Sequence, residues 1–444
     1  MNEYVLSKYN FFCAEGDSVV GLNLYNQNLF SISKEKYQLL LDFASHIDDL
    51  QSIDPVLFST MYKLGIIQDK DLDIPSILLM ENREEVFASG EYHLTINTTL
   101  NCNFSCWYCF ESHHVSKMTE ETKKAIIEFV RKIIQEKKIK ILRLNWFGGE
   151  PLMTYKSVLK PLSEQINNLC NENNVQLTTA ITTNGYLVNT DIVDFFKKYK
   201  VTAYQITLDG NRIHHNQVRY NKREGSYDTI VKNICRIVTA LPDVTMLLRI
   251  NYSKNNIDTC TDVINSFPVE VRTKISINLV QIMQEKNHDI STYIREKEIY
   301  SIFRKAGFRQ IKHSLFPKKK YSCYAELFNQ SIINYDSRVF KCSTCDFENS
   351  EEEGVLLNDG RIVWNDSSRS KRLAKATFDN TNCLNCEYLP ICRGGCSNNC
   401  FGANEEKCVI KPRYDYLIKE LMTKFPAANR KLIGARQLEE IIEE

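Results

Sequence analysis

The sequence predicts an α/β protein whose central part is a partial (β/α)6 TIM barrel, preceded by a small α+β module and followed by a cysteine-rich domain. Two observations predict the barrel: six short β-rich segments follow one another from Tyr92 onward, and amphipathic helical segments separate them. A third observation marks the last domain, because nine of the 16 cysteines lie between Cys323 and Cys408. We expect domains at residues 1–85, 90–310 and 311–444.

Residues 1–85 begin with β-rich segments and continue with helical ones. The expected strands are Tyr4–Cys13, Val19–Leu24 and Asn28–Ile32, and the expected helices are Glu35–Ala44 and Pro55–Leu64. This order predicts an α+β, winged-helix-like module. The stretch Asp69–Ser89 is charged and weakly periodic, so we expect it to be a linker.

The barrel prediction depends on six expected strands, Tyr92–Thr98, Ile139–Trp146, Gln176–Thr183, Thr202–Leu208, Thr245–Asn251 and Lys274–Gln281. The clearest helix between them is Glu120–Glu136, whose apolar residues share one face behind a Thr119 N-cap. Strict alternation of strand and helix predicts a parallel sheet. In such sheets functional groups gather at the C-terminal ends of the strands. After residue 310 the sequence becomes turn-rich, and it ends in a charged helical tail, Tyr414–Glu444.

Composition narrows the class of protein. The chain has 444 residues, of which 43% are hydrophobic and 25% charged, so it is long enough to form packed domains without disulfides. Its net charge of +1 provides no global field that would attract nucleic acid or an anionic membrane. Neither a signal segment at the start nor a membrane-length apolar run is present, so we expect a cytoplasmic protein. Cytosolic thiols stay reduced, which favours metal binding for the clustered cysteines. The scattered ones are expected to be small buried hydrophobic residues: Cys13, Cys170, Cys235 and Cys260.

Three cysteines, Cys102, Cys106 and Cys109, lie on the loop that follows the first expected barrel strand. Three thiolates at this spacing can bind three irons of a 4Fe-4S cluster and leave the fourth iron open. The alternative is a zinc site in which His113 or His114 supplies a fourth ligand.

The Cys-x3-Cys-x2-Cys pattern, with Tyr108 before its last cysteine, resembles the signature of radical S-adenosylmethionine (SAM) enzymes. Further motifs at expected strand ends resemble the SAM contacts of that family, namely Gly148-Gly149-Glu150-Pro151, Thr183-Asn184 and Asp209. Glycines allow backbone carbonyls to approach a ligand, and Glu150 can accept a hydrogen bond from an ammonium group. The resemblance covers residues 90 to 290.

The resemblance implies one-electron chemistry. The resemblance implies that Cys102, Cys106 and Cys109 hold the catalytic cluster. It also implies that Tyr108 and the motif residues of the preceding paragraph bind SAM. A reduced cluster would cleave SAM to methionine and a 5′-deoxyadenosyl radical, which abstracts hydrogen from the substrate. A low-potential flavodoxin or ferredoxin is implied as electron donor. Candidate acid-base groups in the barrel are Asp209, His214, His215, Arg219 and Tyr220, and we interpret His214-His215 as a surface pair.

The second cysteine group resembles the SPASM extension of radical SAM enzymes, which carries two auxiliary 4Fe-4S clusters. The resemblance assigns auxiliary cluster I to Cys323, Cys342 and Cys396, with Cys345 as fourth ligand, and auxiliary cluster II to Cys383, Cys386, Cys392 and Cys408. The chain departs from the pattern in two places: Asp336-Ser337 occupies a turn where a glycine is usual, and an extra Cys400 competes with Cys408. From spacing alone, two zinc knuckles are an equal alternative.

The N-terminal module resembles in architecture the RiPP recognition element, which captures the leader of a ribosomally made peptide as an added strand. The alternative is a domain that only packs on the barrel. We therefore expect a peptide maturase that installs a thioether or carbon-carbon cross-link in a precursor peptide. A second hypothesis is an anaerobic sulfatase maturase that forms formylglycine, although its catalytic Asp follows a cluster cysteine where this chain has Ser343. A third is a zinc-rich peptide-binding protein without catalysis.

Overall fold

The structure is a computed structural model that describes residues 3–88, 90–221, 224–285, 290–310, 316, 319–321, 323–370, 372–373, 378, 380–394, 408 and 411–424. The chain divides into two compact units. The first comprises Met1–Val86, His313–Glu326 and Lys371–Glu444, and the second comprises Phe87–Lys312 and Leu327–Ser370. The N-terminal segment therefore shares its unit with parts of the cysteine-rich region.

The second unit is built on a large, mostly parallel sheet. Six parallel strands lie side by side in chain order: β6 (Glu91–Asn97), β7 (Ile141–Phe147), β8 (Gln176–Thr183), β9 (Val201–Leu208), β12 (Thr245–Tyr252) and β13 (Ile275–Gln281). All six expected strands are confirmed. At one edge β14 (Arg309–Gln310) adds in parallel, and at the other edge β15 (Gln330–Ile333) pairs in parallel with β6. An antiparallel extension follows β15: β16 (Arg338–Phe340), β17 (Gly354–Leu356) and β18 (Ile362–Trp364).

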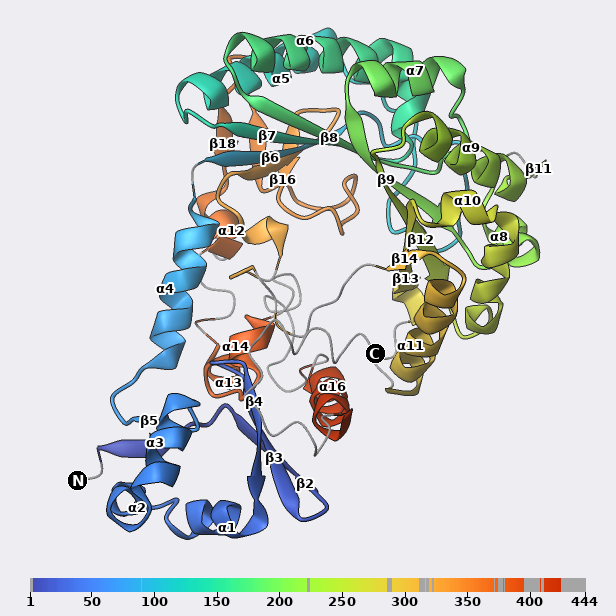
Figure 1. The fold of residues 1–444 in the computed structure, drawn as a ribbon. Helices are drawn as coiled ribbons and strands as arrows, with labels where there is room; N and C mark the ends of the chain where they lie inside the picture. Colours follow the sequence, from blue (N-terminus) through green and yellow to red (C-terminus); the bar gives the residue numbers. More distant parts are fainter. Residues whose placement is uncertain are drawn as a thin grey trace. The chain divides into compact units, whose positions relative to one another are not determined.

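Helices cover one face of this curved sheet (Figure 1). They are α5 (Glu120–Gln135), α6 (Lys160–Glu172), α7 (Thr190–Lys198), α8 (Arg212–Val218), α9 (Tyr227–Ala240), α10 (Val269–Arg272) and α11 (Ile290–Lys305). The predicted cap of α5 is confirmed, because the Thr119 hydroxyl accepts the N–H of Thr122 at 3.1 Å. The unit also contains two short strands, β10 (Tyr220–Asn221) and β11 (Glu224–Gly225), and the short helix α12 (Asp366–Ser370). Four further helical segments are Pro151–Thr154, Tyr155–Leu159, Ile257–Ser266 and Met283–Glu285.

The first unit contains a three-stranded antiparallel sheet of β2 (Asn10–Glu15), β3 (Ser18–Asn23) and β4 (Asn28–Ser33). One set of its apolar residues packs with α1 (Lys34–Asp42), α2 (Asp48–Ile53) and α3 (Pro55–Lys63). The other set packs with α14 (Leu389–Cys392) and α16 (Lys411–Lys424). Two shorter elements precede these helices, namely Tyr324–Glu326 and α13 (Thr381–Leu384).

The single expected strand Tyr4–Cys13 is wrong. The segment forms two strands, because β1 (Tyr4–Leu6) pairs with β5 (Ile67–Asp69) and only β2 joins the sheet. The N–H of Ser7 donates to the carbonyl of Ile66 at 2.9 Å and so extends the pairing with β5, and a turn at residues 8–9 then separates β1 from β2.

The expected linker Asp69–Ser89 is also wrong, because α4 (Ile74–Val86) occupies most of it. Its buried residues recur every four positions, at Ile74, Leu78, Asn82 and Val86. Tertiary contacts stabilise this weakly amphipathic helix. Asn82 donates to the Lys320 carbonyl at 2.8 Å.

None of the described helices is long and apolar enough to cross a membrane. Two of the scattered cysteines, Cys170 and Cys260, are buried as expected, while Cys13 and Cys235 are partly buried. The part of the predicted tail beyond Lys424 lies outside the described residues.

Candidate functional site

The loop after β6 presents Cys102, Cys106 and Cys109 as half-buried free thiols at the C-terminal end of the parallel strands. The loop is turned back on itself, since the N–H of Cys109 donates to the carbonyl of Cys106 at 3.1 Å. The N–H of Phe104 donates to Cys102 Sγ at 3.4 Å. Burial raises the pKa of all three thiols, that of Cys102 to about 12. Only thiolates ligate metal, so cluster binding here would release protons.

The two glycines after β7 bring this strand end against the cysteine loop. The N–H of Gly149 donates to Thr99 O at 3.0 Å, and the N–H of Glu150 donates to Asn101 O at 2.9 Å. A Cβ at Gly149 would lie 2.5 Å from the carbonyl oxygens of both Leu100 and Asn101. From the sequence we expected these glycines to admit a ligand. In the structure they admit the backbone that leads into Cys102.

Glu150 is completely buried and joins the ends of β7 and β8. Its Oε1 accepts from the N–H of Leu152 at 2.9 Å and the hydroxyl of Thr183 at 2.7 Å. Its Oε2 accepts from the N–H of Asn184 at 2.7 Å. Burial raises the pKa of Glu150, while these hydrogen bonds oppose the shift. A carboxylate offers about four lone-pair sites, so one acceptor position remains for an ammonium group.

Asn184 connects this carboxylate to the cysteine loop. Its Nδ2 donates to Asn103 Oδ1 at 2.8 Å and lies 3.9 Å from Cys102 Sγ. Hydrogen bonds to ligand sulfurs tune iron-sulfur clusters. The structure thus brings four predicted residues together: Cys102, Glu150, Thr183 and Asn184.

Tyr108 lies at the centre of a second network. Its hydroxyl donates to Asp209 Oδ2 at 2.6 Å and accepts from Arg219 Nη1 at 2.9 Å and Asn251 Nδ2 at 3.2 Å. Asp209 is buried at the end of β9, and burial raises its pKa. The sequence motifs predict Tyr108 and Asp209 as site residues. They assign no role to Asn251, which is the last residue of an expected strand.

Arg219 was a candidate acid-base residue, but its environment points to an electrostatic role. Its guanidinium carbon lies 5.6 Å from the centre of the Phe104 ring. Burial works against the charge, yet Tyr108, Cys106 and Asp209 raise the pKa of Arg219 well above its usual value. Its buried Nε has no hydrogen-bond partner among the described residues. A permanently charged group with a free donor suits an anion rather than proton transfer. The neighbouring Tyr220 lies in β10 and pairs with Gly225.

The interpretation of His214-His215 as a surface pair is wrong for His215, which is completely buried. Asn211 caps α8, and the resulting helical turn directs His215 inward while His214 stays partly exposed. His215 Nδ1 accepts the N–H of Asp209 at 3.2 Å, so Nε2 carries the proton and donates to Ser226 Oγ at 2.9 Å. Burial lowers the pKa of His215 well below its usual value, which keeps the ring neutral.

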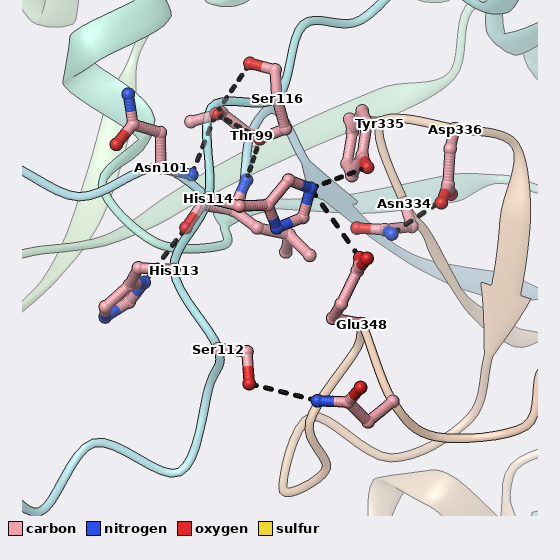
Figure 2. Close-up of polar contacts among 12 residues, drawn as sticks. Thr99, Asn101, Ser112, His113, His114, Ser116, Asn334, Tyr335, Asp336 and Glu348 are labelled. Carbon is pink, nitrogen blue, oxygen red and sulfur yellow. Dashed lines mark hydrogen bonds and ion pairs between the residues drawn. The ribbon is translucent and has the colours of Figure 1, made fainter.

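The segment after the first cysteine loop is bonded to the turn and loop around β16 (Figure 2). His114 Nε2 lies 2.9 Å from the Tyr335 hydroxyl and 3.6 Å from Glu348 Oε2. His113 Nδ1 lies 2.9 Å from Leu100 O. Both proposed zinc ligands therefore have other partners. Within the described ranges no three His, Cys, Asp or Glu side chains converge to hold one ion, as a structural zinc site requires.

The same loop holds two of the predicted ligands of auxiliary cluster I, Cys342 and Cys345. The N–H of Thr344 donates to Cys342 Sγ at 3.3 Å. Cys323 belongs to the first unit, where its carbonyl accepts the N–H of Glu326 at 3.0 Å. Cys396, like the competing Cys400, lies outside the described residues.

The four predicted ligands of auxiliary cluster II, Cys383, Cys386, Cys392 and Cys408, all belong to the first unit. Burial raises the pKa of Cys392 to about 12, and Cys408, Cys383 and Cys386 lie close enough to add to the shift. Cys386 Sγ accepts the N–H of Tyr388 at 3.4 Å. The same bond, from the amide two residues ahead to the sulfur, therefore occurs in all three cysteine motifs. Such amide donors stabilise thiolate ligands, so the residues present fit iron-sulfur binding.

Comparison with known families agrees with this geometry. The radical SAM superfamily matches residues 96–265. The "Radical SAM cyclopropyl synthase TigE" of Paramaledivibacter caminithermalis is 26% identical over 417 residues, which cover 84% of this chain and 82% of the relative. The "Cysteine-type anaerobic sulfatase-maturating enzyme" of Clostridium novyi is 21% identical over 328 residues, covering 67% and 86%.

Two solved structures have a similar fold. The structure titled "Native anSMEcpe with bound AdoMet" has a TM-score of 0.55 at 16% identity and covers 74% of this chain and 99% of its own. Streptococcus suis SuiB bound to S-adenosylmethionine has a TM-score of 0.50 at 16% identity and covers 91% and 99%. Residues 96–265 therefore match the radical SAM superfamily, and the relatives named above are enzymes.

Proposed function

We propose that this radical SAM enzyme modifies a ribosomally made precursor peptide, in which it installs a thioether or carbon-carbon cross-link. The observation that carries the proposal is the extent of the likeness. The SuiB fold covers 91% of this chain, whereas the anSMEcpe fold covers 74%. SuiB has also been solved bound to its precursor peptide SuiA. The relative TigE, named a cyclopropyl synthase, covers 84% of this chain.

When bound, the cluster and SAM supply the 5′-deoxyadenosyl radical that abstracts a hydrogen atom from the substrate. Cys102, Cys106 and Cys109 would hold this cluster. Glu150, with Thr183 and Asn184, positions two strand ends around it and offers an acceptor to the SAM ammonium group. Arg219 provides a guanidinium beside the thiols for the SAM carboxylate. Tyr108 and Asp209, which are hydrogen-bonded to each other, would also contact SAM.

The cysteine-rich segments would hold two auxiliary 4Fe-4S clusters. Cys408 is favoured as the last ligand of auxiliary cluster II, because its thiol contributes to the raised pKa of Cys392, as the thiols of Cys383 and Cys386 do. A low-potential flavodoxin or ferredoxin would supply the electrons. The N-terminal segment, residues 1–85, would bind the leader: β2 and β4 are the outer strands of their sheet, and a sheet edge can pair with an extended peptide.

Formylglycine formation is the second candidate, favoured by the similarity to sulfatase-maturating enzymes. Asp346, which follows Cys345, is poorly suited to act as its base. Although burial opposes the shift, hydrogen bonds from Ser112 and Asn349 lower the pKa of Asp346 to about 2. Its Oδ2 accepts from both side chains at 2.7 Å. A carboxylate held in this way connects two loops and has little tendency to take a proton.

The test is the metal content of the anaerobically purified full-length protein, with SAM cleavage measured beside it. We expect about twelve irons per chain, falling by about four in a variant with all three loop cysteines changed to alanine, together with loss of 5′-deoxyadenosine. Short peptides encoded beside the gene are then incubated with the enzyme and SAM. Mass spectrometry should show a peptide whose mass is lower by two hydrogen atoms. Stoichiometric zinc without SAM cleavage would instead support a zinc-rich peptide-binding protein. Conversion of a cysteine or serine to formylglycine would support the second candidate.

A further inference from the structure

Arg249 is a charged residue in the middle of β12. It lies opposite Thr207 of β9 and Asn278 of β13. Its neighbours Leu248 and Ile250 are completely buried in the apolar core, while Arg249 is half-buried. Because successive side chains of a strand point to opposite faces, Arg249 points away from the face on which Leu248 and Ile250 pack in the apolar core. Its two register partners are uncharged.

The hydrogen bonds of Arg249 leave most of its guanidinium available. Its Nε donates to Asn251 Oδ1 at 2.8 Å, and Asn251 in turn donates to the Tyr108 hydroxyl. Among the residues that the structure describes, its two Nη groups have no hydrogen-bond acceptor. Asp209, the nearby carboxylate, accepts the Tyr108 hydroxyl through Oδ2, and its buried Oδ1 has no hydrogen-bond partner among the described residues, so neither oxygen accepts from Arg249. A partly desolvated guanidinium with free donors is stabilised best by a planar carboxylate, which it can bind through two parallel hydrogen bonds.

Two carboxylates could occupy this position, that of SAM and that of a substrate. The surroundings of Arg219 and Arg249 distinguish the two possibilities. Arg219 lies over the ring of Phe104, which stands between Cys102 and Cys106 in the cysteine loop, and it donates directly to the Tyr108 hydroxyl. Arg249 instead reaches the same hydroxyl through Asn251. Arg219 therefore suits the cofactor, and Arg249 is left for the substrate.

We propose that Arg249 binds a carboxylate of the peptide substrate, an aspartate or glutamate side chain next to the residue that loses hydrogen. This inference rests on the proposed function and names the class of peptide. Arg249 acts as a specificity-determining residue, since a peptide with an amide in place of the carboxylate leaves the guanidinium unpaired.

The test uses the reconstituted full-length enzyme with SAM and two probes, N-acetyl-glutamate methylamide and N-acetyl-glutamine methylamide. Saturation-transfer NMR gives their affinities for wild type, R249Q, R249K and the control R212Q, in which an exposed ion pair of α8 with Asp228 is removed. We expect wild type and R212Q to bind the glutamate probe about tenfold more tightly than the glutamine probe. R249Q loses this preference, and R249K keeps part of it because lysine retains the charge without the planar fork.

SAM affinity and iron content of the same variants complete the test. Both stay at the wild-type level in R249Q if Arg249 serves the substrate. A loss of SAM affinity of about tenfold in R249Q would assign Arg249 to the cofactor and overturn the inference. Equal binding of the two probes to wild type would overturn the inference while the proposed function stands. Binding of neither probe to wild type would count against both.

Discussion

Single buried polar side chains organise the ends of the strands. Glu150 accepts three hydrogen bonds and His215 accepts the amide of Asp209, so both side chains hold backbone segments that carry predicted site residues. Neither role is apparent from residue type alone. A glutamate after two glycines resembles a ligand residue, and two adjacent histidines resemble a surface pair.

His215 should make the stability of the protein depend on pH. Its pKa is lowered in the folded state by burial, so unfolding binds a proton below the ordinary histidine pKa of about 6.5. Stability is therefore fully present above that pH and falls as the pH drops below it, by up to about 1.4 kcal/mol per pH unit. We expect the thermal midpoint to fall more between pH 7.5 and 5.5 in wild type than in H215Q.

The matched control for this measurement is H214Q, since His214 is partly exposed on the same helix. H214Q should retain the pH dependence of wild type. An H215Q variant with the wild-type pH dependence would show that other groups account for it.

At the scale of elements, backbone contacts determine where the first cysteine loop lies. Gly149 is a point of close approach, because its missing Cβ leaves room for the carbonyls of both Leu100 and Asn101. We expect G149A to push the loop away from β7, to destabilise the protein by roughly 1–3 kcal/mol and to lower the iron content by about four per chain. Iron analysis and thermal unfolding measure the two effects.

Gly90 provides the control, since a Cβ there would meet nothing within 4 Å. G90A should retain the iron content of wild type. If G149A also retained its iron, the close approach of the two backbones would not be what holds the cysteine loop.

The turn between β15 and β16 departs from the SPASM pattern, in which a glycine is usual at this turn. Ser337 occupies it with φ of 72°, a conformation that favours glycine. Its hydroxyl lies 3.1 Å from the Thr122 hydroxyl of α5, a contact that glycine lacks. The hydrogen bond offsets part of the backbone strain.

At the scale of the whole molecule, segments far apart in sequence form one unit. Arg393 follows Cys392 and is buried. It donates to the carbonyl of Leu78 at 3.3 Å and to Glu81 at 2.9 Å, both in α4. Phe11 of β2 lies 5.2 Å from Tyr388, measured between ring centres. The predicted leader-binding segment and the predicted auxiliary cluster II thus share a core.

We expect E81Q to weaken this connection. The mutation removes the negative charge that pairs with buried Arg393, and because Glu81 is partly exposed the cost should be about 1 kcal/mol. Hydrogen exchange of the α4 amides should become faster. D359N, which removes an exposed ion pair with Arg361 in the other unit, should leave α4 exchange unchanged. Unchanged exchange in E81Q would mean that apolar packing alone holds α4.

Local sequence patterns are enough to predict the parallel sheet, its six central strands and the strand ends at which site residues lie. These features follow from local periodicity and motif spacing: the expected strand Gln176–Thr183 has the observed bounds, and Thr119 caps α5. Three features are seen in the folded structure alone: α4 is a helix, His215 is buried, and the Nη groups of Arg249 have no hydrogen-bond acceptor among the described residues. Each of these depends on partners distant in sequence, because burial and hydrogen bonding override weak local preferences.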